Sequence, residues 1–522
     1  MAAALDRLSE RSRGLTFSAD TTAAYVSFAE LGELTADLAA RWAGLGVRPG
    51  DRVVLVADDE YEFALLFLAA LRAGVVAVPV HPPYRMGQAE HYGTILRRVV
   101  SDSTATCCIV GGPLREAVTG ARLALPVHEP ADLRAAAPGA IRAPQPQDTA
   151  FLQFSSGTTA DPKAVIVSHR ALLANAEAIR AGLRAGPEDK AVSWLPLYHD
   201  MGLVGFLVVP VINQIATWYQ SPLRFARSPI GWLRLISEVG ATIAFAPNFA
   251  YGLLATRATD ADVATLDLSA WRIAGCGAEP VHAHTLRAFA ERFAPAGFDE
   301  HAILPSYGLA ESTLAVTLSP AGRGLRTTRH DDREIVSCGV PVAGTEVRIL
   351  GPDGDWCDPG VEGEICVRGA SLADGYHGKP EETARTWADG WLRTGDQGFL
   401  LHGHLYVTGR IKDLILANGT NHHPHDIERV AGTVAGIRPG NIAALPVRNR
   451  HSEGVRLVFS LARGADRDRV IEQVRRIVRR ELGLSVHDVL IVQGDLPKTS
   501  SGKLRRALTA ELLRTGELVV RS

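Results

Sequence analysis

One short segment of this 522-residue chain combines residue types that bind phosphate. An apolar run, 151–154, leads into a hydroxyl-rich loop, and Pro162-Lys163 then precede a second apolar run. The loop consists of Ser155, Ser156, Gly157, Thr158 and Thr159. Hydroxyls and open backbone N–H groups around a glycine can bind phosphate oxygens, and one lysine can neutralise their charge. The loop is not a Walker loop, because no Gly-Lys-[Ser/Thr] opens a helix. Taken alone, it could equally be a flexible hairpin.

Four later segments favour a nucleotide site. Ser306-Tyr-Gly-Leu-Ala-Glu311 places a carboxylate after a glycine turn, which suits Mg²⁺ on a nucleotide. Trp391-Leu-Arg-Thr-Gly-Asp396 offers an aspartate at a turn that can accept from both hydroxyls of a ribose. Gly409-Arg-Ile-Lys-Asp413 lies at a proposed domain boundary, and Pro497-Lys-Thr-Ser-Ser-Gly-Lys503 puts a lysine on a Gly/Ser loop. Each alone could be a solvated loop, but all five in this order are unlikely to be accidental.

The elements that must position these residues alternate between strand and helix in the first part of the chain. Asp51–Val56 and Val75–Val80 predict buried strands around a helix at Glu60–Arg72, which Gly74 ends. The pattern recurs at 107–110, 232–246 and 271–274. Short strands separated by helices indicate βαβ units and a parallel sheet.

From about Val336 the pattern changes to short strands that predict a small β meander or barrel, such as Glu346–Leu350 and Gly363–Arg368. A helix near Asp426, strands near 443 and 457, and a charged helix over 466–482 follow. The sequence therefore predicts an α/β fold with a large N-terminal domain over 1–409, made of βαβ-wound sheets plus the meander. A small mobile α+β domain is expected over 410–522.

Composition excludes several classes of protein. A formal net charge of −2 argues against a dedicated nucleic-acid surface. Six irregularly spaced cysteines without a CxxC pair argue against a disulfide scaffold or a zinc site. The charged start lacks a signal-peptide core, and the apolar runs fall short of a membrane span. A soluble, cytoplasmic protein is expected.

The ordered set of five motifs resembles the adenylate-forming superfamily, which comprises acyl-CoA synthetases, peptide-synthetase adenylation domains and firefly luciferase. The resemblance covers nearly the whole chain. Within the superfamily, the chain looks most like fatty acyl-AMP ligases in five segments: 193–203, 246–251, 277–280, 406–413 and 421–428. The resemblance implies an acid–thiol ligase that uses ATP and Mg²⁺.

The resemblance also implies roles for the nucleotide-binding residues. The loop at 155–159 would close over the β- and γ-phosphates, with Lys163 at its edge. Adenine would be lined by Gly277, Ala278 and Glu279, with Tyr307 stacked on it. The other nucleotide ligands would be Glu311 for Mg²⁺, Asp396 for the ribose, and Arg410 for the ribose or a phosphate.

The implied catalytic residues are Lys503, His199 and Glu311, with Lys412 as the hinge of the C-terminal domain. A carboxylate attacking the α-phosphate brings two anions together, and a cation that holds both lowers the barrier. Lys503 would bridge the acyl carboxylate and the α-phosphate. His199 would border the acyl site, although a lone histidine could also be an ordinary core residue.

The acyl side would be lined by small or apolar residues: Met201, Gly202, Phe206, Asn248, Phe249, Ala250, Gly252 and Gly308. No acidic or basic side chain among them could bind the charged amine of an amino acid, so a hydrophobic carboxylic acid is expected. Some of these residues could instead be ordinary core.

The chain departs from the family pattern in three places. Ala164 replaces a usual glycine, and Ala310 replaces a threonine of many relatives, as it does in fatty acyl-AMP ligases. Only 24 residues separate Glu311 from Val336, so the insertion that fatty acyl-AMP ligases typically carry there is expected to be absent.

The acceptor of the acyl group is left open between CoA, the phosphopantetheine arm of a carrier protein, and a partner enzyme that receives acyl-AMP. A relative that performs only one half-reaction is the alternative. A monomer or a homodimer is expected.

Overall fold

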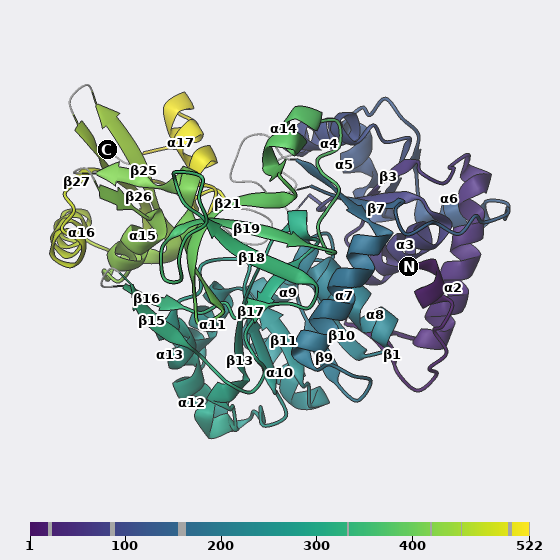
Figure 1. The fold of residues 1–522 in the computed structure, drawn as a ribbon, viewed down its shortest axis with the longest axis horizontal. Helices are drawn as coiled ribbons and strands as arrows, with labels where there is room; N and C mark the ends of the chain where they lie inside the picture. Colours follow the sequence, from purple (N-terminus) through teal and green to yellow (C-terminus); the bar gives the residue numbers. More distant parts are fainter. Residues whose placement is uncertain are drawn as a thin grey trace.

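The structure is a computed structural model that describes residues 1–18, 23–83, 89–154, 163–330, 333–417, 420–449, 452–498 and 504–520. The fold consists of two large sheets, a β meander and a C-terminal α/β unit (Figure 1). The predicted α/β class with a β meander is therefore confirmed. No helix in the described part of the chain is both long and apolar enough to span a bilayer.

The first sheet has six strands in the order β6-β5-β3-β4-β7-β8. Their bounds are β3 (Arg52–Val56), β4 (Val76–Pro79), β5 (Cys107–Val110), β6 (Val127–His128), β7 (Thr149–Phe154) and β8 (Ala164–Ser168). All neighbours are parallel except β7 and β8, which form an antiparallel pair around residues 155–162.

Helix α3 (Glu60–Ala73) shows how the sequence sets these elements. The side chain of Asp59 accepts from the backbone N–H groups of Tyr61 and Glu62, which caps the first turn. Gly74 adopts a left-handed conformation with a φ of 69°, which ends the helix and turns the chain into β4. The helix therefore begins at the predicted Glu60, and the predicted Gly74 ends it.

The second sheet has nine strands in the order β17-β14-β13-β12-β11-β9-β10-β1-β2. Their bounds are β1 (Gly14–Ser18), β2 (Ala23–Ser27), β9 (Lys190–Ser193), β10 (Ala216–Gln220), β11 (Ile243–Ala246), β12 (Ile273–Cys276), β13 (Ile303–Gly308), β14 (Ala315–Leu318) and β17 (Val340–Pro341). The central pairs from β1 to β13 are parallel. The largest hydrophobic core contains residues of both large sheets.

Helices cover these sheets. Among the described residues they are α1 (Ala2–Leu5), α2 (Phe28–Arg41), α4 (Ala89–Ser103), α5 (Arg115–Gly120), α6 (Pro130–Ala135), α7 (His169–Leu183), α8 (Val209–Asn213), α9 (Pro222–Arg227), α10 (Ile230–Val239), α11 (Asn248–Arg257), α12 (Asp260–Ala264) and α13 (Ala283–Phe293). A π-helix, η4 (Met201–Val208), precedes α8.

The predicted meander is an antiparallel sheet. Its strands are β18 (Thr345–Leu350), β19 (Gly363–Gly369), β20 (Trp387–Ala388), β21 (Trp391–Leu401) and β22 (His404–Arg410). The hairpin of β15 (Thr327–His330) and β16 (Arg333–Val336) precedes it, and α14 (Pro380–Thr386) interrupts it. The meander has a hydrophobic core of its own.

The C-terminal elements lie beside the meander, on the left in Figure 1. They are β23 (Ile415–Ala417), β24 (Thr420–His422), α15 (Pro424–Gly432), β25 (Ile437–Asn449), β26 (Ser452–Leu461), α16 (Arg467–Leu482), β27 (Val486–Ile491) and α17 (Arg506–Thr515). Two hydrophobic clusters are formed wholly by residues from Ile415 onward. Helix α16 matches its predicted range, with Asp466 as the capping residue.

Candidate active site

A cavity of about 1750 Å³ lies where the carboxyl ends of strands from both large sheets meet. Gln153 and Phe154 at the end of β7, Phe245 on β11 and the residues that follow β12 and β13 line it. Lys498 and Arg506 line it from the C-terminal part of the chain. Ligands of open parallel sheets bind at this edge, so the cavity is the candidate active site.

Glu311 lies on the short 3₁₀ helix η7 (Ala310–Ser312), which follows β13. Its Oε1 accepts a hydrogen bond of 2.8 Å from the hydroxyl of Tyr376. Burial raises the pKa of Glu311, and the Tyr376 hydroxyl opposes this shift. The described residues contain no group of three or more His, Cys, Asp or Glu arranged to hold a metal. A single carboxylate such as that of Glu311 can hold an Mg²⁺ that is also bound by the phosphates of a nucleotide.

Lys163 and Glu311 both contact Tyr376. Its Nζ is 4.5 Å from the ring centroid of Tyr376 and 2.6 Å from Oε1 of Glu382 on α14. Burial opposes ionisation of Glu382, but the ammonium of Lys163 more than offsets it and lowers the pKa of that carboxyl. The structure thus brings the predicted phosphate-binding cation and the predicted metal-binding carboxylate to one tyrosine.

Asp396 is buried and accepts hydrogen bonds at both oxygens. Tyr307 donates its hydroxyl to Oδ2 at 2.7 Å, and Arg410 donates Nε–H to Oδ1 at 2.9 Å. The Asp396 carboxylate raises the pKa of Arg410 and keeps it charged. Asp396 lies inside β21 and not at the expected turn, and Gly395 before it has a φ of 70°. Each oxygen keeps acceptor capacity for a ribose hydroxyl.

The predicted adenine segment follows β12. A Cβ at Gly277 would lie 2.6 Å from Oγ of Ser306, so glycine lets this segment approach the end of β13. Ala278 has a φ of 68°, an unusual backbone conformation for a residue with a side chain. Glu279 accepts from the backbone N–H of Phe249 at 2.6 Å. Ala278 and Glu279 line the cavity.

His199 lines the cavity just before η4, where Asp200 accepts from the N–H of Met201 at 2.8 Å. π-Helical turns are frequent at functional sites. The predicted acyl-side residues that line the large cavity are Met201, Phe206, Asn248, Phe249, Gly252 and Gly308. Gly202 lines a small neighbouring cavity instead, and Ala250 is fully buried outside both linings.

Six predicted residues lie outside the described part of the chain: Ser155, Ser156, Gly157, Thr158, Thr159 and Lys503. The described residues next to both segments line the cavity. Phe154 and Lys163 flank the first, and Lys498 and Leu504 flank the second and pair through an isolated β-bridge. Lys412 lies on the 3₁₀ helix η8 (Ile411–Asp413), where it is exposed and also lines the cavity.

The sequence analysis did not single out many of the cavity residues, and Gln153, Tyr376 and Glu382 are three of them. Gln153 is buried and donates Nε2–H to the carbonyl oxygen of Tyr198 at 3.1 Å, while its Oε1 has no hydrogen-bond partner among the described residues. A polar residue inside an apolar strand was the available signal. No sequence pattern marks Tyr376 or Glu382, because they approach Lys163 only in the folded chain.

These positions agree with the match to a family model. The model for AMP-binding enzymes matches residues 7–377. The chain belongs to the AMP-binding enzyme family. A putative acyl-CoA synthetase of Caulobacter vibrioides is 38% identical over 518 residues, covering 94% of this chain and 90% of that protein. A long-chain-fatty-acid–AMP ligase of Mycobacterium marinum is 36% identical, covering 90% and 88%.

Solved structures of fatty acyl-adenylate ligases have the same fold as this AMP-binding enzyme. A structure from work on those of E. coli and L. pneumophila has a TM-score of 0.91 at 35% identity, covering 99% of this chain and 98% of that one. The L. pneumophila enzyme with acyl adenylate and pyrophosphate has a TM-score of 0.74 at 33% identity, covering 96% and 93%. The resemblance to adenylate-forming enzymes, and among them to fatty acyl-AMP ligases, is therefore confirmed.

Proposed function

We propose that this AMP-binding enzyme is an ATP-dependent ligase that converts a hydrophobic carboxylic acid to acyl-AMP and pyrophosphate, and then transfers the acyl group to a thiol. One observation carries the proposal. A single cavity places Glu311, Lys163 and Asp396 together with a lining of apolar side chains. A nucleotide and an apolar acid would therefore lie in one enclosed space.

In the first half-reaction, a carboxylate oxygen of the acid attacks the α-phosphorus of ATP. The new O–P bond forms as the bond to the pyrophosphate oxygen breaks, so no proton needs to move. Asp396 would hold the ribose and Lys163 the phosphates, while Lys503 would join the acyl carboxylate to the α-phosphate. Mg²⁺ held by Glu311 would offset charge on the phosphates. These cations act by positioning and by stabilising charge.

We propose residues 410–522 as a mobile domain that carries Lys503. Its hydrophobic clusters are separate from those of the two large sheets, which supports a boundary near Arg410. Lys412 at this boundary would be the hinge. Rotation there would remove Lys503 after adenylation and admit the thiol.

The thiol would be CoA or the phosphopantetheine arm of a carrier protein. The name of one relative, an acyl-CoA synthetase, supports CoA, whereas the name of another, a fatty-acid–AMP ligase, states only the acyl-AMP product and leaves the acceptor open. The short segment between Glu311 and Val336, which contains β14 and β15, favours an enzyme without the insertion that restrains the C-terminal domain. Transfer of acyl-AMP to a partner enzyme is the second candidate.

Mass spectrometry of the purified chain with Mg-ATP tests the proposal. Medium and long fatty acids, aryl acids and bulky polycyclic acids are each incubated with and without CoA. We expect acyl-AMP from a hydrophobic acid, and conversion to acyl-CoA would identify CoA as the acceptor.

Lys503→Ala should lower the rate of adenylation by about 10²–10³-fold. Lys190→Ala is the control, because that lysine is exposed on β9 and donates to the carbonyl oxygen of Val239. Absence of acyl-AMP with every acid would contradict the proposal.

A further inference from the structure

One wall of the active-site cavity is apolar. It consists of Ile179 and Leu183 of α7, Phe206 of η4, Ile243 and Phe245 of β11, and Leu318 of β14. These elements pack together closely. The rings of Phe206 and Phe245 are 5.9 Å apart, and a Cβ at Gly182 of α7 would lie 2.8 Å from Cδ1 of Leu318. We call these six residues the apolar wall.

Another part of the lining is polar. Thr256, Arg257, His284 and Thr285 contribute from α11 and α13, and Arg429 and Thr433 contribute from the α15 region. The charge of Arg429 reaches His284 and helps to lower its pKa, after the larger effect of burial. An alkyl chain gains most by leaving water for an apolar surface, so the apolar wall is the favoured place for it.

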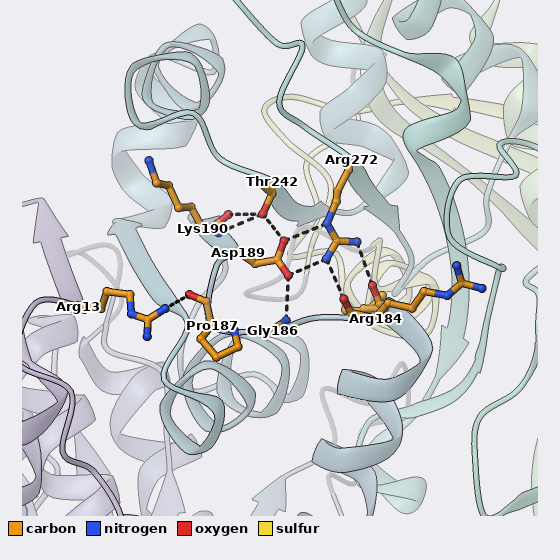
Figure 2. A network of polar contacts seen from close by, with 9 residues as sticks. Arg13, Arg184, Gly186, Pro187, Asp189, Lys190, Thr242 and Arg272 are labelled. Atoms are coloured by element: carbon orange, nitrogen blue, oxygen red, sulfur yellow. Dashed lines mark hydrogen bonds and ion pairs between the residues drawn. The ribbon is translucent and has the colours of Figure 1, made fainter.

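A polar network lies at the ends of two elements of the apolar wall, after α7 and before β11 (Figure 2). Arg272 donates Nε–H and Nη2–H to the two carboxylate oxygens of Asp189, at 2.9 and 2.7 Å. Its Nη1–H donates to the carbonyl oxygen of Leu183 at 3.0 Å. Thr242, the residue before Ile243, donates its hydroxyl to Asp189 at 2.7 Å. The main chain at Leu183 and next to Ile243 is therefore held by an ion pair whose carboxylate is largely buried.

Gly205 also lines the cavity, on η4, next to Phe206 of the apolar wall. It lines the cavity four residues after Met201 and is partly accessible from it, while its neighbours Val204 and Phe206 are buried. A Cβ at Gly205 would lie 3.4 Å from Cδ2 of Leu314, which is ordinary van der Waals contact. Its φ is not positive, so a larger residue meets no backbone strain. A larger side chain would therefore extend into the cavity.

We propose that Gly205 determines the length of the acyl chain that this enzyme accepts, by leaving open the space along the apolar wall up to Leu183 and Ile243. This inference rests on the proposed adenylation function and adds the position that sets its chain-length range. Each methylene excluded from the wall should lower kcat/KM about fourfold. A short acid, whose chain would end before Gly205, should be unaffected.

The test is acyl-AMP formation by the full-length chain with saturated acids of increasing length. Gly205→Leu should shift the preference toward shorter acids, with a loss of about tenfold or more for the longest acids. The KM for ATP and the rate with the shortest accepted acid should stay within about twofold of the parent. Gly205→Val, with a smaller side chain, should shift the preference less. Gly231→Leu is the matched control, since Gly231 also lies on a helix, α10, and does not line the cavity.

The outcomes separate this inference from the proposed function. A parent chain that adenylates no acid contradicts both. An active parent with an unshifted profile in both folded Gly205 variants, or with equal losses for short and long acids, overturns only the role of Gly205. A shift in Gly231→Leu would overturn it as well, because the effect would then not depend on the cavity. Thermal unfolding of each variant establishes that it is folded.

Discussion

Tyr376 and Glu311 are joined by a hydrogen bond of 2.8 Å, in which the phenol donates to Oε1 of the carboxylate. The same ring lies under the ammonium of Lys163. Glu311 follows β13, whereas Tyr376 lies in the loop before α14, in the meander. The meander therefore helps to set the charge state of the candidate metal ligand in the second large sheet.

Tyr376→Phe should move the acid limb of the pH profile to higher pH. Burial raises the pKa of Glu311, and the hydrogen bond from Tyr376 partly offsets that rise. Without the donor, the pKa of Glu311 rises further, so Mg²⁺ binding, which needs the carboxylate, is lost at a higher pH. The measurement is kcat/KM for Mg-ATP against pH.

The control for this variant is Tyr25→Phe, an exposed tyrosine of β2. Its profile should coincide with that of the parent. An acid limb that stays in place, or moves to lower pH, in Tyr376→Phe would show that the phenol does not tune Glu311.

Asp396→Asn should weaken ATP binding by about 10–100-fold. The carboxylate accepts from Tyr307 and Arg410. A neutral amide leaves both donors without a charged acceptor, and its NH₂ group cannot accept from a ribose hydroxyl. A hydrogen bond to a charged group contributes about 1.5–3 kcal/mol, which gives this range. Calorimetric titration with a non-hydrolysable ATP analogue measures it. Asp358→Asn, at an exposed position, is the control, and an unchanged affinity in Asp396→Asn would rule out the ribose role.

Much of the fold could be predicted because its signals are local. The run before Gly74 is apolar on nearly every face, and a capping aspartate and a left-handed glycine mark its two ends. The charged helix α16 likewise has a capping aspartate, Asp466, at its start and a left-handed glycine, Gly483, at its end. The first residue of a strand could be predicted less precisely than the ends of these helices. Trp271 was expected in a strand, but β12 begins at Ile273, and the Trp271 indole donates to the carbonyl oxygen of Ile273 instead.

The site could be predicted only in part. Glu311, Asp396 and Lys163 lie in motifs whose residue types indicate nucleotide binding, and all three line one cavity. The side chains that contact Lys163 could not be found, because Tyr376 and Glu382 reach it only in the folded chain. Ala250 was expected at the acyl site from the family resemblance, but successive helical residues point to different sides, and Ala250 is buried in the core.

Arg272→Ala should destabilise the protein by about 2–3 kcal/mol. The substitution leaves the carboxylate of Asp189 largely buried without its cation, and the carbonyl oxygen of Leu183 loses a donor. The free energy of unfolding is measured with denaturant, by tryptophan fluorescence. Arg234→Ala is the matched control, because its pair with Asp262 is more exposed and should contribute less than about 1 kcal/mol. Equal effects in the two variants would contradict a structural role for the Asp189 network.

His425→Gln should make the protein less sensitive to acid between about pH 6.5 and 4. His425 lies on α15 with its ring 6.2 Å from that of His282, and burial lowers its pKa to about 3. Asp426 favours its protonation, whereas His423, His282 and Arg506 oppose it.

In this pH range the unfolded chain binds a proton at His425 that the folded chain excludes, so the free energy of unfolding falls as the pH falls. Removing the imidazole should recover about 1–3 kcal/mol of that loss. Thermal unfolding at pH 7 and pH 5 measures the difference, and the exposed His487→Gln is the control. If the melting temperature of His425→Gln drops between these pH values as much as that of the parent, the buried imidazole is not the acid-sensitive group.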